Sequence, residues 1–105
     1  MTAFITTALL GVLIIVMGAI NMRGNISTIH SYHRSRVSHE NVLPFGRLVG
    51  LGTIIIGIGC ILFAASTLLN NSIVTIIATV LLIISIVVGT ILSFYAMKKY
   101  NGGIF

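Results

Sequence analysis

The chain has 105 residues, which leaves room for one domain. Apolar residues make up 57% of it and charged residues only 7%, whereas ordinary soluble domains are about 25% charged. A soluble fold of this size needs polar residues to cover its surface, and this chain has too few of them. The composition therefore predicts an integral membrane protein. The net charge of +5 would suit nucleic acid, but no basic patch with interleaved aromatic residues stands apart from the apolar segments. No nucleic-acid partner is therefore expected.

The first apolar stretch, AFITTALLGVLIIVMGAINM, covers residues 3–22. About 20 apolar residues in a helix cross the hydrocarbon core of a bilayer, so this stretch predicts a membrane span. A cleaved signal peptide carries positive charge before its apolar region. Here the first charged side chain, Arg23, comes after it. The arrangement therefore favours a retained anchor.

A polar segment follows at residues 23–47 and holds all three histidines, the only acidic residue and four of the six basic residues. Its apolar residues recur at helical spacing up to Val37, which predicts an amphipathic helix lying on the membrane surface. Pro44 is expected to be the break at which the second span starts. Arginines on such a helix would lie near anionic headgroups. The residues predicted to contact lipid or a partner are Ile26, Tyr32, Arg34 and Arg36.

Metal binding is the alternative interpretation of the polar segment. His30 and His33 are one helical turn apart, and His39 with Glu40 would complete three or four ligands. The spacing matches no known zinc motif, and a surface helix would point His39 elsewhere unless the chain turns. A proton-sensing role for the histidines is also open, since their pKa lies near neutrality, but no second feature supports it. The preferred interpretation has no metal and no cofactor.

Two further apolar stretches, residues 48–69 and 73–97, contain no charged side chain and are joined by only Asn-Asn-Ser at 70–72. So short a connection predicts a tight antiparallel hairpin. In lipid every backbone group must bond within its own segment, so the many β-branched residues do not argue against helices. The predicted fold class is all-α, a single domain of three transmembrane helices with a polar tail at 98–105.

The positive charges indicate the orientation. All six Lys and Arg residues flank the first connection or follow the third span, and none lies near the N-terminus or the 70–72 connection. Positive residues stay in the cytoplasm. The sequence therefore predicts a multi-pass protein of the bacterial cell membrane with its N-terminus outside and its C-terminus inside.

Small residues predict where the helices pack, because close backbone approach replaces the hydrophobic effect inside a bilayer. The second span has two such faces, which predicts contact with both other spans, or with one of them and a second copy of the chain. The first face has seven members: Gly46, Gly50, Thr53, Gly57, Cys60, Ala64 and Thr67. The second face and the faces of spans one and three are Gly52, Gly59 and Ser66; Thr7, Gly11, Gly18 and Asn21; and Ala78, Ser85, Gly89 and Ser93.

No residue pattern predicts an enzyme. One acidic residue excludes a carboxylate pair, and the serines near the histidines show no clear nucleophile, base and acid arrangement. Small multidrug transporters need four spans and a membrane-embedded acid, which this chain lacks. We expect a non-enzymatic interaction or accessory protein. The alternative is an oligomeric, holin-like pore or small-solute carrier subunit, although only Thr, Ser and Gly are available to line its path.

Two blocks, IHSYH at residues 29–33 and GRLVGLG at 46–52, lie within the stretch 24–59. On these blocks the chain resembles a family of small bacterial membrane proteins, common in Gram-positive species, that is classed only as a domain of unknown function. The resemblance implies a membrane location and a plan of three spans. It implies no activity, substrate or site residue.

Overall fold

The computed structural model describes residues 2–24 and 37–102. Within these ranges all regular structure is helical: α1 covers Thr2–Met22, the short 3-10 helix η1 covers His39–Asn41, α3 covers Val42–Ser66 and α4 covers Ser72–Tyr100. The three long helices are each long and apolar enough to cross a membrane. The predicted fold class, all-α with three candidate transmembrane helices, is confirmed.

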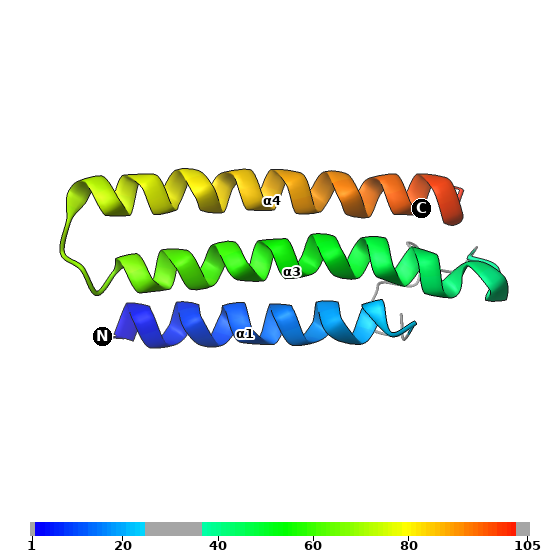
Figure 1. Cartoon of the computed structure of the whole chain (residues 1–105), viewed down its shortest axis with the longest axis horizontal. Helices are drawn as coiled ribbons and strands as arrows, with labels where there is room; N and C mark the ends of the chain where they lie inside the picture. Colours follow the sequence, from blue (N-terminus) through cyan, green and yellow to red (C-terminus); the bar gives the residue numbers. More distant parts are fainter. Residues whose placement is uncertain (1, 25–36, 103–105) are drawn as a thin grey trace.

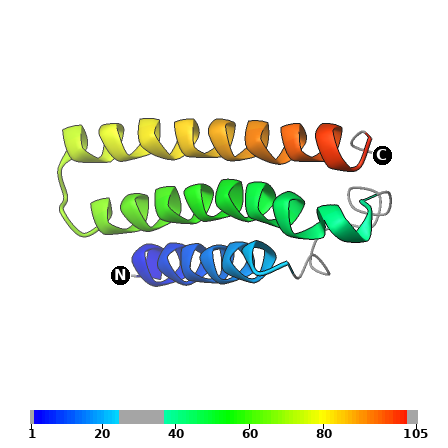
Figure 2. The same cartoon turned by 45° about the vertical axis from the view of Figure 1, so that its right-hand side comes forward.

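The three long helices lie side by side in a row, with α3 in the middle (Figures 1 and 2). Both outer helices pack along α3 and run antiparallel to it. Of the residues in an apolar 18-residue stretch of each helix, 39% are buried in α3, whereas 11% are buried in α1 and 11% in α4. Because neighbouring helices are antiparallel, the C-terminal end of α1, the N-terminal end of α3 and the C-terminal end of α4 lie together at one end of the long axis. The α3–α4 turn lies at the other end of that axis.

The second span begins earlier than the sequence predicts. We expected it at residues 48–69, but α3 starts at Val42 and ends at Ser66. Pro44, which the sequence predicts as the break that starts the second span, lies in the first turn of α3. Backbone N–H groups in a first turn have no partner inside the helix, so a proline there removes no hydrogen bond. The last part of the predicted polar segment, including Arg47, is thus helical.

The connection between α3 and α4 lies at residues 67–71 and not at 70–72 as predicted. Asn70 has a φ of 48°, in the left-handed region that asparagine tolerates better than most residues. The side-chain oxygen of Asn71 accepts hydrogen bonds from the backbone N–H groups of Ile73 and Val74, at 3.0 and 3.2 Å. This cap satisfies two free donors of the first turn and explains why α4 begins at Ser72.

The far end of α4 also differs from the prediction, which stopped the third span at residue 97. The helix continues through Lys98 and Lys99 to Tyr100. It stops where the backbone N–H of Asn101 donates to the carbonyl of Met97, at 2.9 Å, and Gly102 takes a φ of 76°. A glycine in this left-handed conformation is a common helix terminator.

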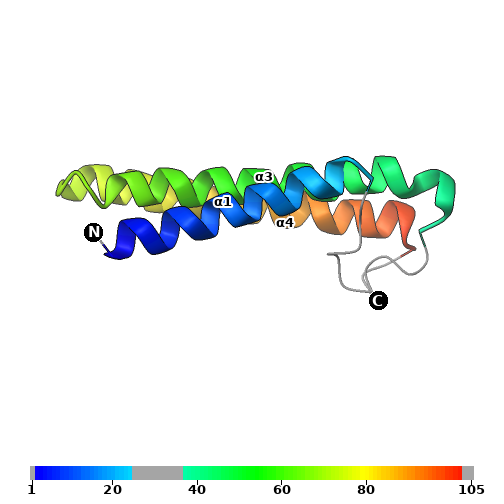
Figure 3. The ribbon, with the colours of Figure 1, turned by 90° about the horizontal axis from the view of Figure 1, so that it is seen from below.

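Glycines bring α1 and α3 into backbone contact. A Cβ atom on Gly18 would lie 2.7 Å from the carbonyl oxygen of Gly50, and one on Gly57 would lie 2.9 Å from that of Gly11. These approaches leave no room for a side chain. The pairs are seven residues apart on each helix, the spacing that keeps one face of a helix against its neighbour. Figure 3 shows α1 crossing α3 obliquely along this contact.

The second face of α3 packs on α4. A Cβ atom on Gly52 would lie 2.6 Å from the carbonyl oxygen of Gly89, and one on Gly59 would lie 2.7 Å from the hydroxyl of Ser85. The two small-residue faces of α3 therefore contact its two neighbours within the same chain. On α3, Gly46, Cys60 and Ala64 from the predicted first face are also buried.

Candidate functional site at the charged end of the helices

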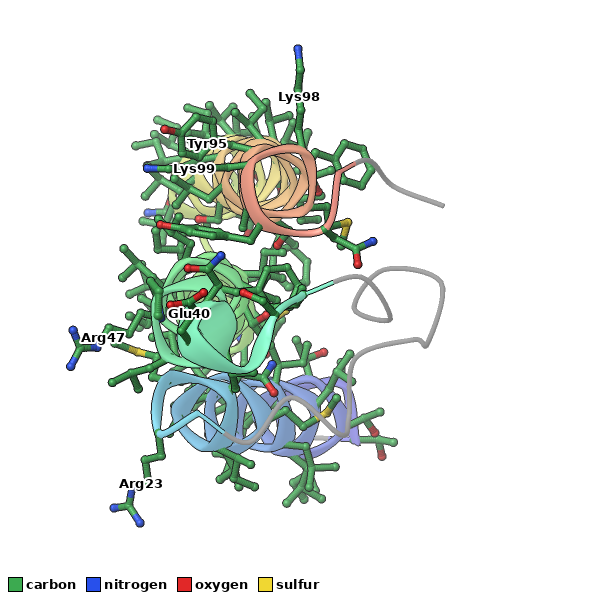
Figure 4. All side chains as sticks on the ribbon, turned by 90° about the vertical axis from the view of Figure 1, so that its right-hand side faces the viewer. Arg23, Glu40, Arg47, Tyr95, Lys98 and Lys99 are labelled. Atoms are coloured by element: carbon green, nitrogen blue, oxygen red, sulfur yellow. The ribbon has the colours of Figure 1, made fainter. Side chains whose placement is uncertain are left out.

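Four of the six basic side chains lie in the described part of the chain, and all four are at one end of the row (Figure 4). Arg23 follows α1, Arg47 lies in the second turn of α3, and Lys98 and Lys99 lie in the last turn of α4. All are exposed. Figure 4 shows Arg47 and Lys99 on the same side of the row, whereas Lys98 and Arg23 point away beyond α4 and α1.

The positions of these charges fit the thickness of a bilayer. From Arg47 to Ser66, α3 rises about 28 Å, close to a hydrocarbon core of about 30 Å. Because Gly52 lies opposite Gly89 on an antiparallel helix, Arg47 is near the level of Tyr95. Lys98 and Lys99 then lie about one turn farther out. Tyrosine rings favour this boundary between apolar core and headgroups.

Lys99 is positioned by two aromatic rings. Its Nζ lies 5.8 Å from the ring centroid of Tyr95 and 5.3 Å from that of Tyr100. Both distances allow cation–π attraction. Tyr95 and Lys99 share a helix face because they are four residues apart. Together with Lys98 they line an open hollow of about 370 Å³ on α4.

A packed apolar cluster supports the charged end from inside. Phe45 of α3 is fully buried, and its ring meets that of Tyr100 edge to face, with centroids 6.4 Å apart and an interplanar angle of 81°. The other members are Val49, Ala96 and Met97, with Val37, Leu48 and Tyr100 packed partly buried against them. Val37 closes the predicted surface segment, so the chain returns from that segment onto α3 and α4. Sequence reasoning missed this cluster because Phe45 and Tyr100, whose rings meet in it, lie outside the predicted spans.

Most of the predicted contact and metal residues lie outside the described residues: Ile26, His30, Tyr32, His33, Arg34 and Arg36. His39 begins η1, and Glu40 is exposed beside it. Within residues 2–24 and 37–102, no three His, Cys, Asp or Glu side chains are grouped so that they could hold a metal ion. The predicted surface helix and the alternative metal site both stay predictions.

Five hydroxyl groups in the helices or at a helix end bond to their own backbone. Thr53, Thr79 and Ser85 each donate to the carbonyl oxygen four residues earlier, at 2.8 Å. Ser66 and Thr67 donate three residues back, at 2.6 and 2.7 Å. Such bonds satisfy a hydroxyl donor without a neighbouring helix or water. These five groups therefore do not offer free donors along a path for a solute.

Comparison of the chain with protein-family models, with curated proteins and with solved structures finds no match. The resemblance at residues 24–59 to a family of small bacterial membrane proteins therefore stays a prediction.

Proposed function

We propose that the protein is a non-enzymatic, multi-pass protein of the bacterial cell membrane, with its N-terminus outside and its charged end in the cytoplasm. Its role is that of an interaction or accessory protein, in which residues 23–47 contact a partner protein or lipid of the inner leaflet. One observation carries the proposal: the four described basic side chains gather at one end of the helix row and point outward from it. Positive residues mark the cytoplasmic side of membrane proteins.

The packing of the charged end supports this role for the connection. Gly24 follows α1, while Val37 packs against the Phe45 cluster between α3 and α4. The described residues on the two sides of this connection, Gly24 and Val37, thus both lie at the charged end of the helices.

The alternative, a pore or carrier subunit, has less support. Hydroxyl groups are the main polar side chains within the helices, and the described bonds direct five of them to their own backbone carbonyls. Proteoliposomes loaded with a fluorescent dye separate the two functions. The accessory role predicts that the dye is retained, whereas a pore predicts its release.

A prediction about charge tests the proposed contact. Replacing Arg34 and Arg36 with Gln should weaken binding of the 23–47 peptide to anionic vesicles about 30-fold at low salt, since each arginine contributes about 1 kcal/mol at such a surface. The loss should shrink at high salt because the interaction is screened. Vesicle co-sedimentation over a range of lipid concentrations measures both effects.

The matched control replaces His30, His33 and His39 with Gln in the same peptide and should change vesicle binding little at neutral pH, where histidines are mostly uncharged. Titration of zinc into the full-length protein provides the opposing test. Micromolar or tighter zinc binding that disappears in the triple-histidine variant would contradict the proposal and favour the metal site.

A further inference from the structure

The hollow on α4 is lined by side chains of the kinds that bind phosphate groups. Lys98 and Lys99 supply two ammonium groups, and Tyr95, one turn earlier, supplies a phenol hydroxyl. All three side chains are exposed. Figure 4 shows Lys98 pointing away from the other helices, while Lys99 and Tyr95 lie toward one side of α4. The site faces the surroundings of the molecule.

The depth of the hollow matches the layer of lipid headgroups. Tyr95 is near the level of Arg47, at the edge of the apolar part of α3, and the two lysines lie about one turn, or roughly 5 Å, beyond it. With its 29 residues α4 is about 44 Å long, so one end extends past a hydrocarbon core of about 30 Å. The ammonium groups thus lie at the depth of the lipid phosphates, while Tyr95 lies at the boundary between the headgroups and the hydrocarbon core.

Lys98 and Lys99 lie in the last turn of α4, where positive charge also interacts favourably with the helix dipole. The backbone N–H of Asn101 already donates to the carbonyl of Met97, and Lys99 lies over the rings of Tyr95 and Tyr100. Glu40, the only acidic residue in the sequence, lies in η1 before α3 and does not line the hollow. Among the described residues, the side chains that line the hollow thus carry two positive charges and no negative one.

We propose that Tyr95, Lys98 and Lys99 form a binding site for the phosphate diester headgroup of an anionic phospholipid. The lysines bind the phosphate oxygens, and the Tyr95 hydroxyl donates to the phosphate or to the headgroup beside it. The ring of Tyr95 positions Lys99 before the lipid arrives. The site rests on the proposed insertion into a membrane, but it requires neither the proposed orientation nor a partner for residues 23–47.

Native mass spectrometry of the full-length protein in a neutral detergent tests the site. The probes are dioleoylphosphatidylglycerol, dioleoylphosphatidylcholine and inorganic phosphate. We expect one phosphatidylglycerol to remain bound in preference to phosphatidylcholine, and Lys98→Gln/Lys99→Gln to weaken its binding about 10-fold or more, because it removes both charge-assisted contacts with the phosphate. Binding of inorganic phosphate with the same dependence on these lysines would identify a free-anion site and overturn the choice of a lipid.

Two matched variants distinguish a site from general charge. Arg23→Gln/Arg47→Gln removes the same charge from the same end but lies outside the hollow, so it should weaken phosphatidylglycerol binding no more than about 3-fold if the charges act only at long range. Lys98→Arg/Lys99→Arg should retain binding. Equal losses in the two Gln variants would overturn the proposal. Circular dichroism in the same detergent shows whether each variant is folded. If Lys98→Gln/Lys99→Gln is not folded, the test depends on Lys98→Arg/Lys99→Arg, in which loss of phosphatidylglycerol binding would overturn the proposal.

Discussion

Replacing Gly57 with leucine is expected to lower the free energy of unfolding by about 3 kcal/mol, the upper range for overpacking a well-packed interior. A Cβ atom at this position would lie 2.6 Å from Cγ1 of Ile15 and 2.9 Å from the carbonyl oxygen of Gly11. A small shift of either helix cannot make room for the leucine, because α1 and α3 are in equally close contact at Gly18 and Gly50. The helices must therefore separate along their shared face. Unfolding by sodium dodecyl sulfate, followed by far-UV circular dichroism, measures the loss.

Ile58→Leu is the matched control. Ile58 is the next residue along α3 and 48% exposed, so an apolar substitution there should leave stability nearly unchanged. Equal unfolding curves for the Gly57 and Ile58 variants would mean that the glycine face of α3 lies against lipid and that α1 packs elsewhere.

Phe45→Ala is expected to have an effect of similar size, a loss of about 3 kcal/mol, the lower range for removing a fully buried phenylalanine. Phe45 has no exposed surface and packs with Val49, Ala96 and Met97 beneath the ring of Tyr100. The substitution leaves a cavity where the start of α3 meets the end of α4. We also expect the segment that returns at Val37 to lose its attachment and become more sensitive to protease.

The same detergent titration measures the loss, and limited proteolysis of the purified protein measures the release of the segment. Leu43→Ala removes a neighbouring side chain of the same turn region that is 42% exposed, and it should change neither quantity much. Unchanged protease sensitivity in Phe45→Ala would show that the cluster does not hold the first connection in place.

The sequence predicted the three helices well because uninterrupted apolar stretches of this length have one stable structure in lipid. It also identified both packing faces of α3, since Gly50, Gly57, Gly52 and Gly59 recur at spacings that keep a helix face. It left open whether the second face meets another part of the chain or a second copy. The structure shows α4 on that face, a result that depends on how the helices are arranged and not on the pattern of one helix.

The helix ends were predicted poorly, and for a physical reason. We placed each boundary where charges begin, although a helix continues as long as its hydrogen bonds and packing continue. Arg47 and Lys98 lie within helices because Phe45 and Tyr100, both outside the predicted apolar stretches, pack against each other. The hollow at Tyr95, Lys98 and Lys99 was invisible for the same reason, since the tail from residue 98 was not expected to be helical.

Labelling of single cysteines by an impermeant maleimide tests the proposed orientation most directly. Cysteine is placed at Ser72, at the start of α4, or at Ser38, beside η1, in a Cys60→Ser background; both serines are exposed and lie at opposite ends of the row. The native Cys60 is buried and is removed to prevent any background reaction. We predict that residue 72 reacts in intact cells, whereas residue 38 reacts only after the cells are lysed. Reaction of residue 38 in intact cells with protection of residue 72 would contradict the orientation, and reaction of both would contradict a membrane-spanning helix row.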